Sequence, residues 1–193
     1  MKKIFLALKR HDLFIIHYSL FIIAAVFSSC KPVTPSYSSG GFPKQYNLCY
    51  QEIYGHCYDS VPYAVVALDL YSDGLTLNDD HRIQGTGYNL YLSDIFVPDS
   101  LLAEGEYQSL SPLASRLSPF TFLPGRDFEG TPHGIYLLDI EENQIARIQV
   151  LDSGSFAYRN DSLIFTLYYR NTYGSRSTYK CTFHGELIPW QKP

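Results

Sequence analysis

Catalytic motifs are missing from this 193-residue sequence, and helical periodicity is nearly absent from it. It contains no GxSxG elbow, HExxH pair, phosphate-cradling glycine loop or Cys–His pair at catalytic spacing. Only one methionine and one tryptophan occur, against 17 tyrosines and 12 phenylalanines. Because aromatic residues are enriched in strands, the composition predicts a β-sheet protein. The missing motifs favour a protein that is not an enzyme and that needs no cofactor.

Positive charge is also scarce outside the first residues. The formal net charge is −4, but residues 1–29 alone carry +3 through Lys2, Lys3, Lys9, Arg10 and Asp12, which leaves −7 on the remainder. An acidic surface repels phosphate backbones, and no cluster of Lys or Arg interleaved with aromatic residues follows residue 31. The sequence therefore argues against a nucleic-acid-binding protein.

The basic N-terminus is followed by an apolar run from residue 13 to residue 27, interrupted only by His17, Tyr18 and Ser19. A basic segment before an apolar segment of this length is typical of a secretory signal peptide. At 15 residues the run is shorter than the roughly 20 that a membrane-spanning helix needs. We therefore expect a signal peptide over residues 1–29, with an uncleaved membrane anchor as the alternative.

The end of this leader reads "AVFSSCKP" and places Cys30 directly after Ser28 and Ser29. The stretch resembles the lipobox of bacterial lipoprotein signal peptides, although Phe27 stands where leucine is more usual. The resemblance implies that the chain is cut before Cys30 and that the Cys30 thiol becomes the lipid attachment site. The membrane would then be a partner through this lipid, held durably because several acyl chains bind far better than one.

Residues 30–43 are rich in proline, serine and glycine, which predicts a flexible tether, and residues 44–193 are long enough for a single all-β domain. Some surface-exported lipoproteins of the Bacteroidetes carry acidic residues after the lipidated cysteine, whereas this chain has Lys31 and Pro32. We expect an outer-membrane lipoprotein of the cell envelope, and both the periplasmic and the surface-exposed orientation stay open.

Three further cysteines are Cys49, Cys57 and Cys181. In an oxidising compartment Cys49 and Cys57 are candidates for a disulfide, because their spacing suits two short neighbouring strands. Cys181 lies at an inward position of an alternating strand, which favours a buried thiol. No metal site is predicted: His56 beside Cys57 lacks the paired spacing of zinc motifs, and the oxygen-rich loop 73–81 does not match an EF-hand.

Strict alternation of apolar and polar residues dominates the chain from residue 44 onward. Val66, Leu68 and Leu70 share one face of a predicted strand, and the C-terminal part from 134 to 187 repeats this pattern as a meander separated by turn signals at 141–144, 152–154, 159–161 and 171–175. A period of two indicates half-buried strands, whose apolar faces must be buried against each other. We predict an antiparallel β-sandwich of jelly-roll type, with a closed lipocalin-like barrel as the alternative.

Residues 98–133 interrupt the alternation with several prolines. Strands are expected there only around Tyr107 and around 120–123, and the rest is a candidate functional loop because compact domains rarely contain so long an irregular segment. The order "GTGYNLYLSDIF", "LLAEGEY" and "YKCTFHGEL" within residues 63–187 resembles all-β modules of secreted lipoproteins from gut Bacteroidetes. Those modules largely lack an assigned activity, so the resemblance implies a fold and a location rather than a chemistry.

Tyrosines at outward strand positions suggest a ligand face made of Tyr71, Tyr91 and Tyr168 with Asp69 and Asn89. Aromatic rings with polar neighbours can stack against sugars, although tyrosine also suits exposed sheet surfaces in general. The leading hypothesis is a lipid-anchored, non-enzymatic binding or scaffolding module with a glycan or envelope-protein partner. The alternatives are a glycan-binding accessory lipoprotein, a carrier of a small apolar ligand and, least favoured, a hydrolase.

Overall fold

The structure is a computed structural model that describes residues 41–58, 61–111 and 116–190. The predicted signal peptide, Cys30 and most of the tether lie outside these residues. Every regular element in the described part of the chain is a strand, which confirms the all-β class. Among the same residues, no helix has the length and apolar character needed to cross a membrane.

One large mixed sheet contains most of the strands. In spatial order its main path runs β1 (Gln45–Tyr46), β15 (Arg176–His184), β14 (Ser162–Arg170), β13 (Ser153–Arg159), β7 (Gly105–Ser109), β8 (Thr121–Phe122), β6 (Gly87–Val97), β3 (Ala64–Tyr71), β2 (Leu48–Gly55) and β16 (Ile188–Trp190). Strand β11 (Ile135–Glu141) pairs with the first half of β6, and β12 (Gln144–Val150) pairs with β11.

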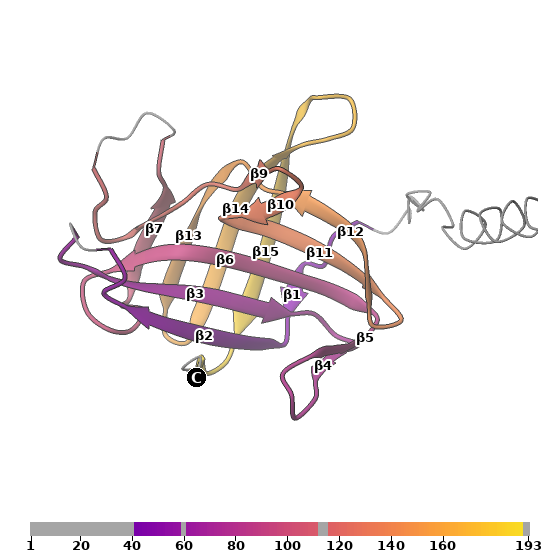
Figure 1. The fold of residues 1–193 in the computed structure, drawn as a ribbon, viewed down its shortest axis with the longest axis horizontal. Helices are drawn as coiled ribbons and strands as arrows, with labels where there is room; N and C mark the ends of the chain where they lie inside the picture. The colour runs from indigo at the N-terminus through magenta and orange to yellow at the C-terminus, as the bar shows by residue number, and fades with distance from the viewer. Residues whose placement is uncertain (1–40, 59–60, 112–115, 191–193) are drawn as a thin grey trace, which may run out of the picture. The chain divides into compact units, whose positions relative to one another are not determined.

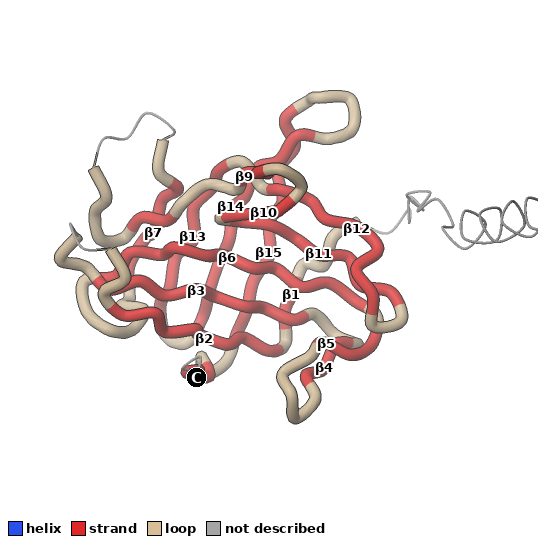
Figure 2. The backbone as a smooth tube through the Cα atoms, in the orientation of Figure 1, coloured by secondary structure: helices blue, strands red, loops and turns tan. Residues whose placement is uncertain are grey.

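The sheet is strongly curled, so that β13, β14 and β15 cross behind the layer formed by β2, β3, β6 and β11 (Figure 1; Figure 2). Strands β1 and β2 are separated only by Asn47, yet β1 pairs with β15 and β2 pairs with β3. One short segment therefore contributes the first strand and the last strand but one to the strand order. Most pairs are antiparallel as expected, whereas β1–β15, β7–β8 and β16–β2 are parallel.

Two hairpins of the meander form at the turn signals read from the sequence. Glu142 and Asn143 join β11 to β12, and Asn160 and Asp161 join β13 to β14, all four with positive φ between 48° and 68°. Positive φ at both central residues is the mark of a type I′ turn, whose twist matches that of paired strands. Asparagine and aspartate tolerate this left-handed conformation, which explains their presence at three of the four positions, Asn143, Asn160 and Asp161.

The curled sheet encloses the main core, which we call the interior. Val66, Leu68 and Leu70 point into it as predicted, together with large aromatic residues from the opposite strands. The rings of Tyr107 and Phe156 stack with centroids 4.5 Å apart. Since most of these side chains have almost no surface that water could touch, the interior is filled by side chains.

Two small hairpins extend from the large sheet. The first pairs β4 (Leu75–Leu77) with β5 (Ile83–Gly85), and the second pairs β9 (Arg126–Phe128) with β10 (Thr131–His133). Strands β7, β8, β9 and β10 all lie within 98–133, and the first two confirm the strands expected around Tyr107 and 120–123. The remainder of that segment thus contains more structure than the sequence suggested.

Phe42, near the start of the described residues, packs against the domain. Its ring contacts Tyr88, Tyr169 and Tyr179 edge to face, and the hydroxyl of Tyr179 donates to the Pro43 carbonyl at 2.8 Å. The sequence predicts a tether that extends to residue 43, but Phe42 and Pro43 pack against the folded domain. An aromatic residue in a Gly–Pro-rich segment was the available sign of this docking.

Candidate functional site

The side of β2, β3, β6 and β11 that points away from the interior is called the outer face. Its central row joins Tyr50, Asp69, Tyr91 and Tyr136, which are direct cross-strand partners on the four strands. All eight residues of β3 are buried, so the outer face of this strand is covered as well as its interior face. Polar and aromatic side chains provide that cover.

Two β-bulges interrupt the register around β3. Tyr54 is an extra residue on β2, because Ile53 pairs with Val66 while Gly55 pairs with Val65. On β6, Ser93 and Asp94 together face the single residue Ala67, since Ile95 pairs with Val66 and Leu92 pairs with Leu68. Bulges re-aim side chains and are enriched next to functional sites. Both bulges here supply residues that line the same pocket.

Glu52 is a buried carboxylate on the outer face, with only 4% of its surface exposed. The hydroxyl of Tyr54 donates to its Oε2 atom, and the hydroxyl of Tyr91 donates to the same atom at 3.1 Å. The two hydroxyl oxygens are themselves 3.1 Å apart. Glu52 has no Lys or Arg partner among the described residues, so neutral donors alone satisfy it.

Asp69 forms a second buried network one strand away. The hydroxyl of Tyr71 and the side-chain amide of Asn89 both donate to its carboxylate, the amide at 2.5 Å. The same amide also donates to the Leu70 carbonyl at 3.0 Å. Charge-assisted hydrogen bonds of this kind stabilise a buried carboxylate. Tyr71, Asp69 and Asn89 are therefore largely enclosed and do not form an open binding surface.

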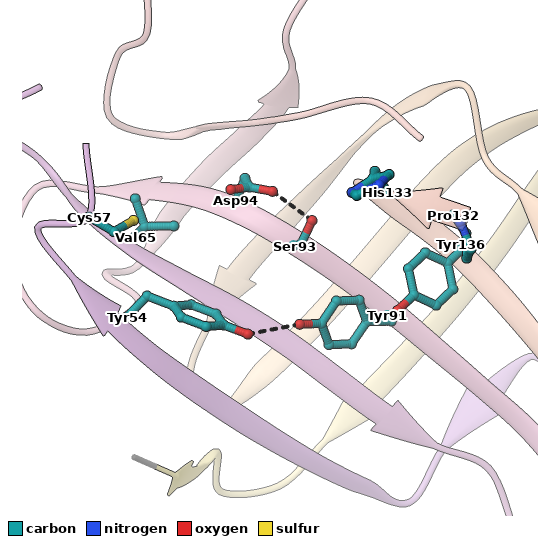
Figure 3. A pocket seen from close by; sticks show the side chains of 9 residues that line it. All are labelled: Tyr54, Cys57, Val65, Tyr91, Ser93, Asp94, Pro132, His133 and Tyr136. Atoms are coloured by element: carbon teal, nitrogen blue, oxygen red, sulfur yellow. Dashed lines mark hydrogen bonds between the residues drawn. The ribbon is translucent and has the colours of Figure 1, made fainter. Parts of the chain in front are cut away.

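A pocket of about 290 Å³ opens on the outer face next to these networks (Figure 3). Its lining comprises Tyr54, Cys57, Val65, Tyr91, Ser93, Asp94, Pro132, His133 and Tyr136. The volume is near the lower end of the roughly 300–1,000 Å³ typical of small-molecule sites. The rings of Tyr91 and Tyr136 lie 5.2 Å apart along one side, and Figure 3 shows His133 from β10 above them and Tyr54 on the opposite side.

Asp94 occupies the β6 bulge with a φ of 53°, a conformation that few residues other than glycine, asparagine and aspartate adopt readily. Its carboxylate accepts hydrogen bonds from the hydroxyls of Tyr58 and Ser93, each at 2.7 Å. Like Glu52, it has no Lys or Arg partner in the described part of the chain. The pocket thus has one carboxylate in its lining and another that is hydrogen-bonded to two of its tyrosines.

The pocket tyrosines stay protonated well beyond neutral pH. Burial raises the pKa of Tyr54 to about 12, with the hydrogen bond to Glu52 adding to the shift. Burial, followed by the negative charges of Asp69 and Glu52, raises the pKa of Tyr136 to about 12. Burial also raises the pKa of Tyr91 far above its ordinary value, aided by its bond with Tyr54 and the charge of Glu52. These phenols act as neutral groups in a negative environment.

The predicted ligand face is only partly reproduced. The structure brings Asp69, Tyr71, Asn89 and Tyr91 together on the outer face, but only Tyr91 lines the pocket. Tyr168 lies on β14, away from this group, where the guanidinium of Arg176 stacks over its ring at 4.0 Å.

Sequence reasoning missed three groups that shape the pocket, namely Glu52, Tyr54 and Tyr136. The alternation of Leu48, Tyr50 and Glu52 within β2 was the available signal for Glu52, whereas Tyr54 lies at the bulge.

The disulfide considered between Cys49 and Cys57 is not formed, and Cys49, Cys57 and Cys181 are free thiols. Cys49 points into the interior, and β2 extends from it to Gly55, a span of about 20 Å at ~3.3 Å per residue. A disulfide requires Cα atoms within about 7 Å. Because the segment is one continuous strand rather than two neighbouring ones, the cysteines lie far apart. Cys181 is buried as expected.

The oxygen-rich segment 73–81 contains β4 and most of the connection to β5. The Asn78 side chain accepts from the Arg82 backbone amide, and the His81 ring stacks on Trp190 with centroids 4.9 Å apart. Within the described ranges, no three or more His, Cys, Asp or Glu side chains are grouped as metal ligands would be.

Comparisons with known proteins add no relative: no family model matches the chain, and no curated protein or solved structure matches it either.

Proposed function

We propose that this chain is a lipid-anchored protein of the bacterial cell envelope that binds a small ligand in the outer-face pocket without transforming it. The pocket carries the proposal, because three tyrosines, a carboxylate, a serine and a histidine converge around about 290 Å³. A concave site with aromatic walls and a few placed polar groups is the usual form of a ligand pocket. The leader that resembles a lipoprotein signal supports the envelope location.

The hydrogen bonds of the lining groups favour a binding role over catalysis. The Ser93 hydroxyl donates to Asp94, and among the described residues His133 forms no hydrogen bond with Ser93 or Cys57. A nucleophile needs a base within hydrogen-bonding distance to be activated. The pocket therefore has polar contacts for a ligand, and its histidine is not hydrogen-bonded to a serine or cysteine that it could activate.

Glycan binding is the second candidate, and the exposed ring of Tyr54 favours it. Tyr54 is 39% exposed at the pocket edge, next to the acceptor oxygens of Asp94 and Ser93. Carrying an apolar ligand has less support, because the described interior side chains fill the space that such a ligand would need.

The proposal is tested by thermal unfolding of the purified full chain against a panel of neutral sugars and small amines. A ligand that binds only the folded state raises Tm in proportion to its occupancy. We expect at least one panel member to raise Tm, and Tyr54→Ala to abolish that rise. Tyr173→Ala is the matched control, because Tyr173 is 91% exposed and lies in the β14–β15 connection.

A panel without any stabilising member would overturn the binding proposal, and so would an equal loss in both variants. The anchor has its own test: mass spectrometry of the mature N-terminus is expected to find an acylated Cys30. An unmodified Cys30 in protein extracted from membranes would contradict the envelope anchor while leaving the pocket intact.

A further inference from the structure

Most hydroxyl groups of the pocket already donate their hydrogen to a carboxylate of the protein. Tyr54 and Tyr91 direct their hydroxyl hydrogens to Glu52, and Ser93 directs its hydrogen to Asp94. A hydroxyl has one donor but two acceptor lone pairs. Of the four lining hydroxyls only that of Tyr136 keeps its hydrogen for a ligand, so the pocket mainly offers acceptors.

The carboxylates of Asp94 and Glu52 have no Lys or Arg counterpart among the described residues. Asp94 and Glu52 are satisfied by hydroxyl groups, which supply hydrogen bonds but no positive charge. The lining contains no lysine or arginine. Two carboxylates close to a low-dielectric pocket leave an electrostatic potential that attracts cations and repels anions.

The tyrosine rings add to the same preference. Tyr54, Tyr91 and Tyr136 present aromatic surface to the pocket, and the face of an aromatic ring attracts a cation through its quadrupole. An ammonium group has donors and no acceptor, and thus fits a site rich in acceptors. Carboxylates beside aromatic rings are a recurring arrangement for binding organic ammonium groups.

From this geometry we infer that the pocket selects a small organic ligand with a positively charged nitrogen, such as an amino sugar or a quaternary amine. The inference rests on the proposed binding function and specifies the ligand class for the same pocket. Asp94 lines the pocket and lies beside the ligand nitrogen, and Glu52, which is hydrogen-bonded to two lining tyrosines, adds a second negative charge.

Two matched probe pairs test the inference by calorimetric titration of the full chain: glucosamine against glucose, and choline against its neutral isostere 3,3-dimethyl-1-butanol. We expect the cation of at least one pair to bind about tenfold more tightly than its neutral partner, equivalent to about 1.4 kcal/mol. The pair that shows the difference identifies whether the nitrogen belongs to a sugar or to a quaternary amine. Added salt should reduce the difference, because it screens charge.

Asp94→Asn removes the charge while keeping a residue that tolerates positive φ, so the bulge should persist. It should weaken the cation by about tenfold and leave the neutral probe unchanged, a loss of roughly 1.4 kcal/mol. Asp79→Asn is the control, because Asp79 is exposed on the β4–β5 hairpin and does not line the pocket.

Equal affinity for both members of each pair overturns the charge preference but leaves the binding function standing. Binding of neither member also overturns it, and the ligand panel then decides separately whether the binding function falls as well.

Discussion

Strand β3 buries both of its faces, but the two sides are built differently. Val66, Leu68 and Leu70 enter an interior of aliphatic and aromatic side chains, whereas Asp69 and Tyr71 join a hydrogen-bonded network on the outer face. Packing apolar groups stabilises a fold directly, but a buried carboxylate must recover its lost hydration through hydrogen bonds. The interior therefore accounts for stability, and the outer face is where binding specificity is expected.

Raising the pH tests the buried phenols of the interior and of the outer face, and it should have the largest effect on stability. Burial raises the pKa of the interior Tyr107 to about 12, as it does for the outer Tyr54 and Tyr136. The unfolded chain deprotonates its phenols near the ordinary value of about 10. Their stabilising contribution is thus complete below about pH 10 and is lost as the pH rises from 10 towards 12.

We expect cooperative alkaline unfolding in which the tyrosinate absorbance of the buried phenols appears together with the loss of the β-sheet circular dichroism signal. Titration of the buried phenols ahead of unfolding would contradict the comparison, because it would mean that burial does not keep them protonated in the folded protein.

Phe156→Ala tests the interior alone. The ring is 2% exposed and lies between Tyr107 at 4.5 Å, Phe122 at 5.4 Å and Phe165 at 5.4 Å. Removing a buried phenylalanine side chain typically costs about 3–5 kcal/mol through lost transfer energy and the remaining cavity. Denaturant unfolding measures the change, and a loss below ~1 kcal/mol would show that the interior is not tightly packed.

Asn89→Leu tests the outer face. The substitution removes the amide that donates to Asp69 at 2.5 Å, and leaves a buried carboxylate with fewer donors. The expected loss in the free energy of unfolding is about 1–3 kcal/mol, because the desolvation penalty of a buried polar group then has no hydrogen bond to offset it. An increase in stability in the same denaturant assay would mean that Asp69 does not depend on this hydrogen bond.

Local patterns in the sequence predicted much of this architecture. Alternation placed Val66, Leu68, Leu70 and Cys181 inward, and asparagine or aspartate marked the hairpin turns, because both signals depend on neighbouring residues only. The parallel pairing of β1 with β15 was not predictable in this way, since it joins segments more than 130 residues apart.

The pocket was harder to predict than the fold. It depends on two single-residue bulges, at Tyr54 and at Ser93–Asp94, and a bulge shifts the alternation without a distinctive local residue pattern. Period two assigned Tyr91 to the outer face, but it could not show that Asp69 and Asn89 would be enclosed by their neighbours. Burial of a polar residue on an outer face depends on what other strands place beside it.

The cysteines offer a local test of the interior against the outer face, with the smallest expected effect on stability. Cys49 and Cys181 are buried in the interior, while Cys57 is exposed and lines the pocket. Alkylation followed by peptide mass spectrometry should modify Cys57 in the folded chain and reach the other two only after unfolding. Burial raises the pKa of the Cys57 thiol, so its reaction should accelerate as the pH rises, because the thiolate is the reactive form.

Cys57→Ser should change the free energy of unfolding by no more than about 0.5 kcal/mol, as expected for an exposed side chain. A larger loss, or protection of Cys57 in the oxidised protein, would instead indicate a disulfide and require β2 to bend back on itself.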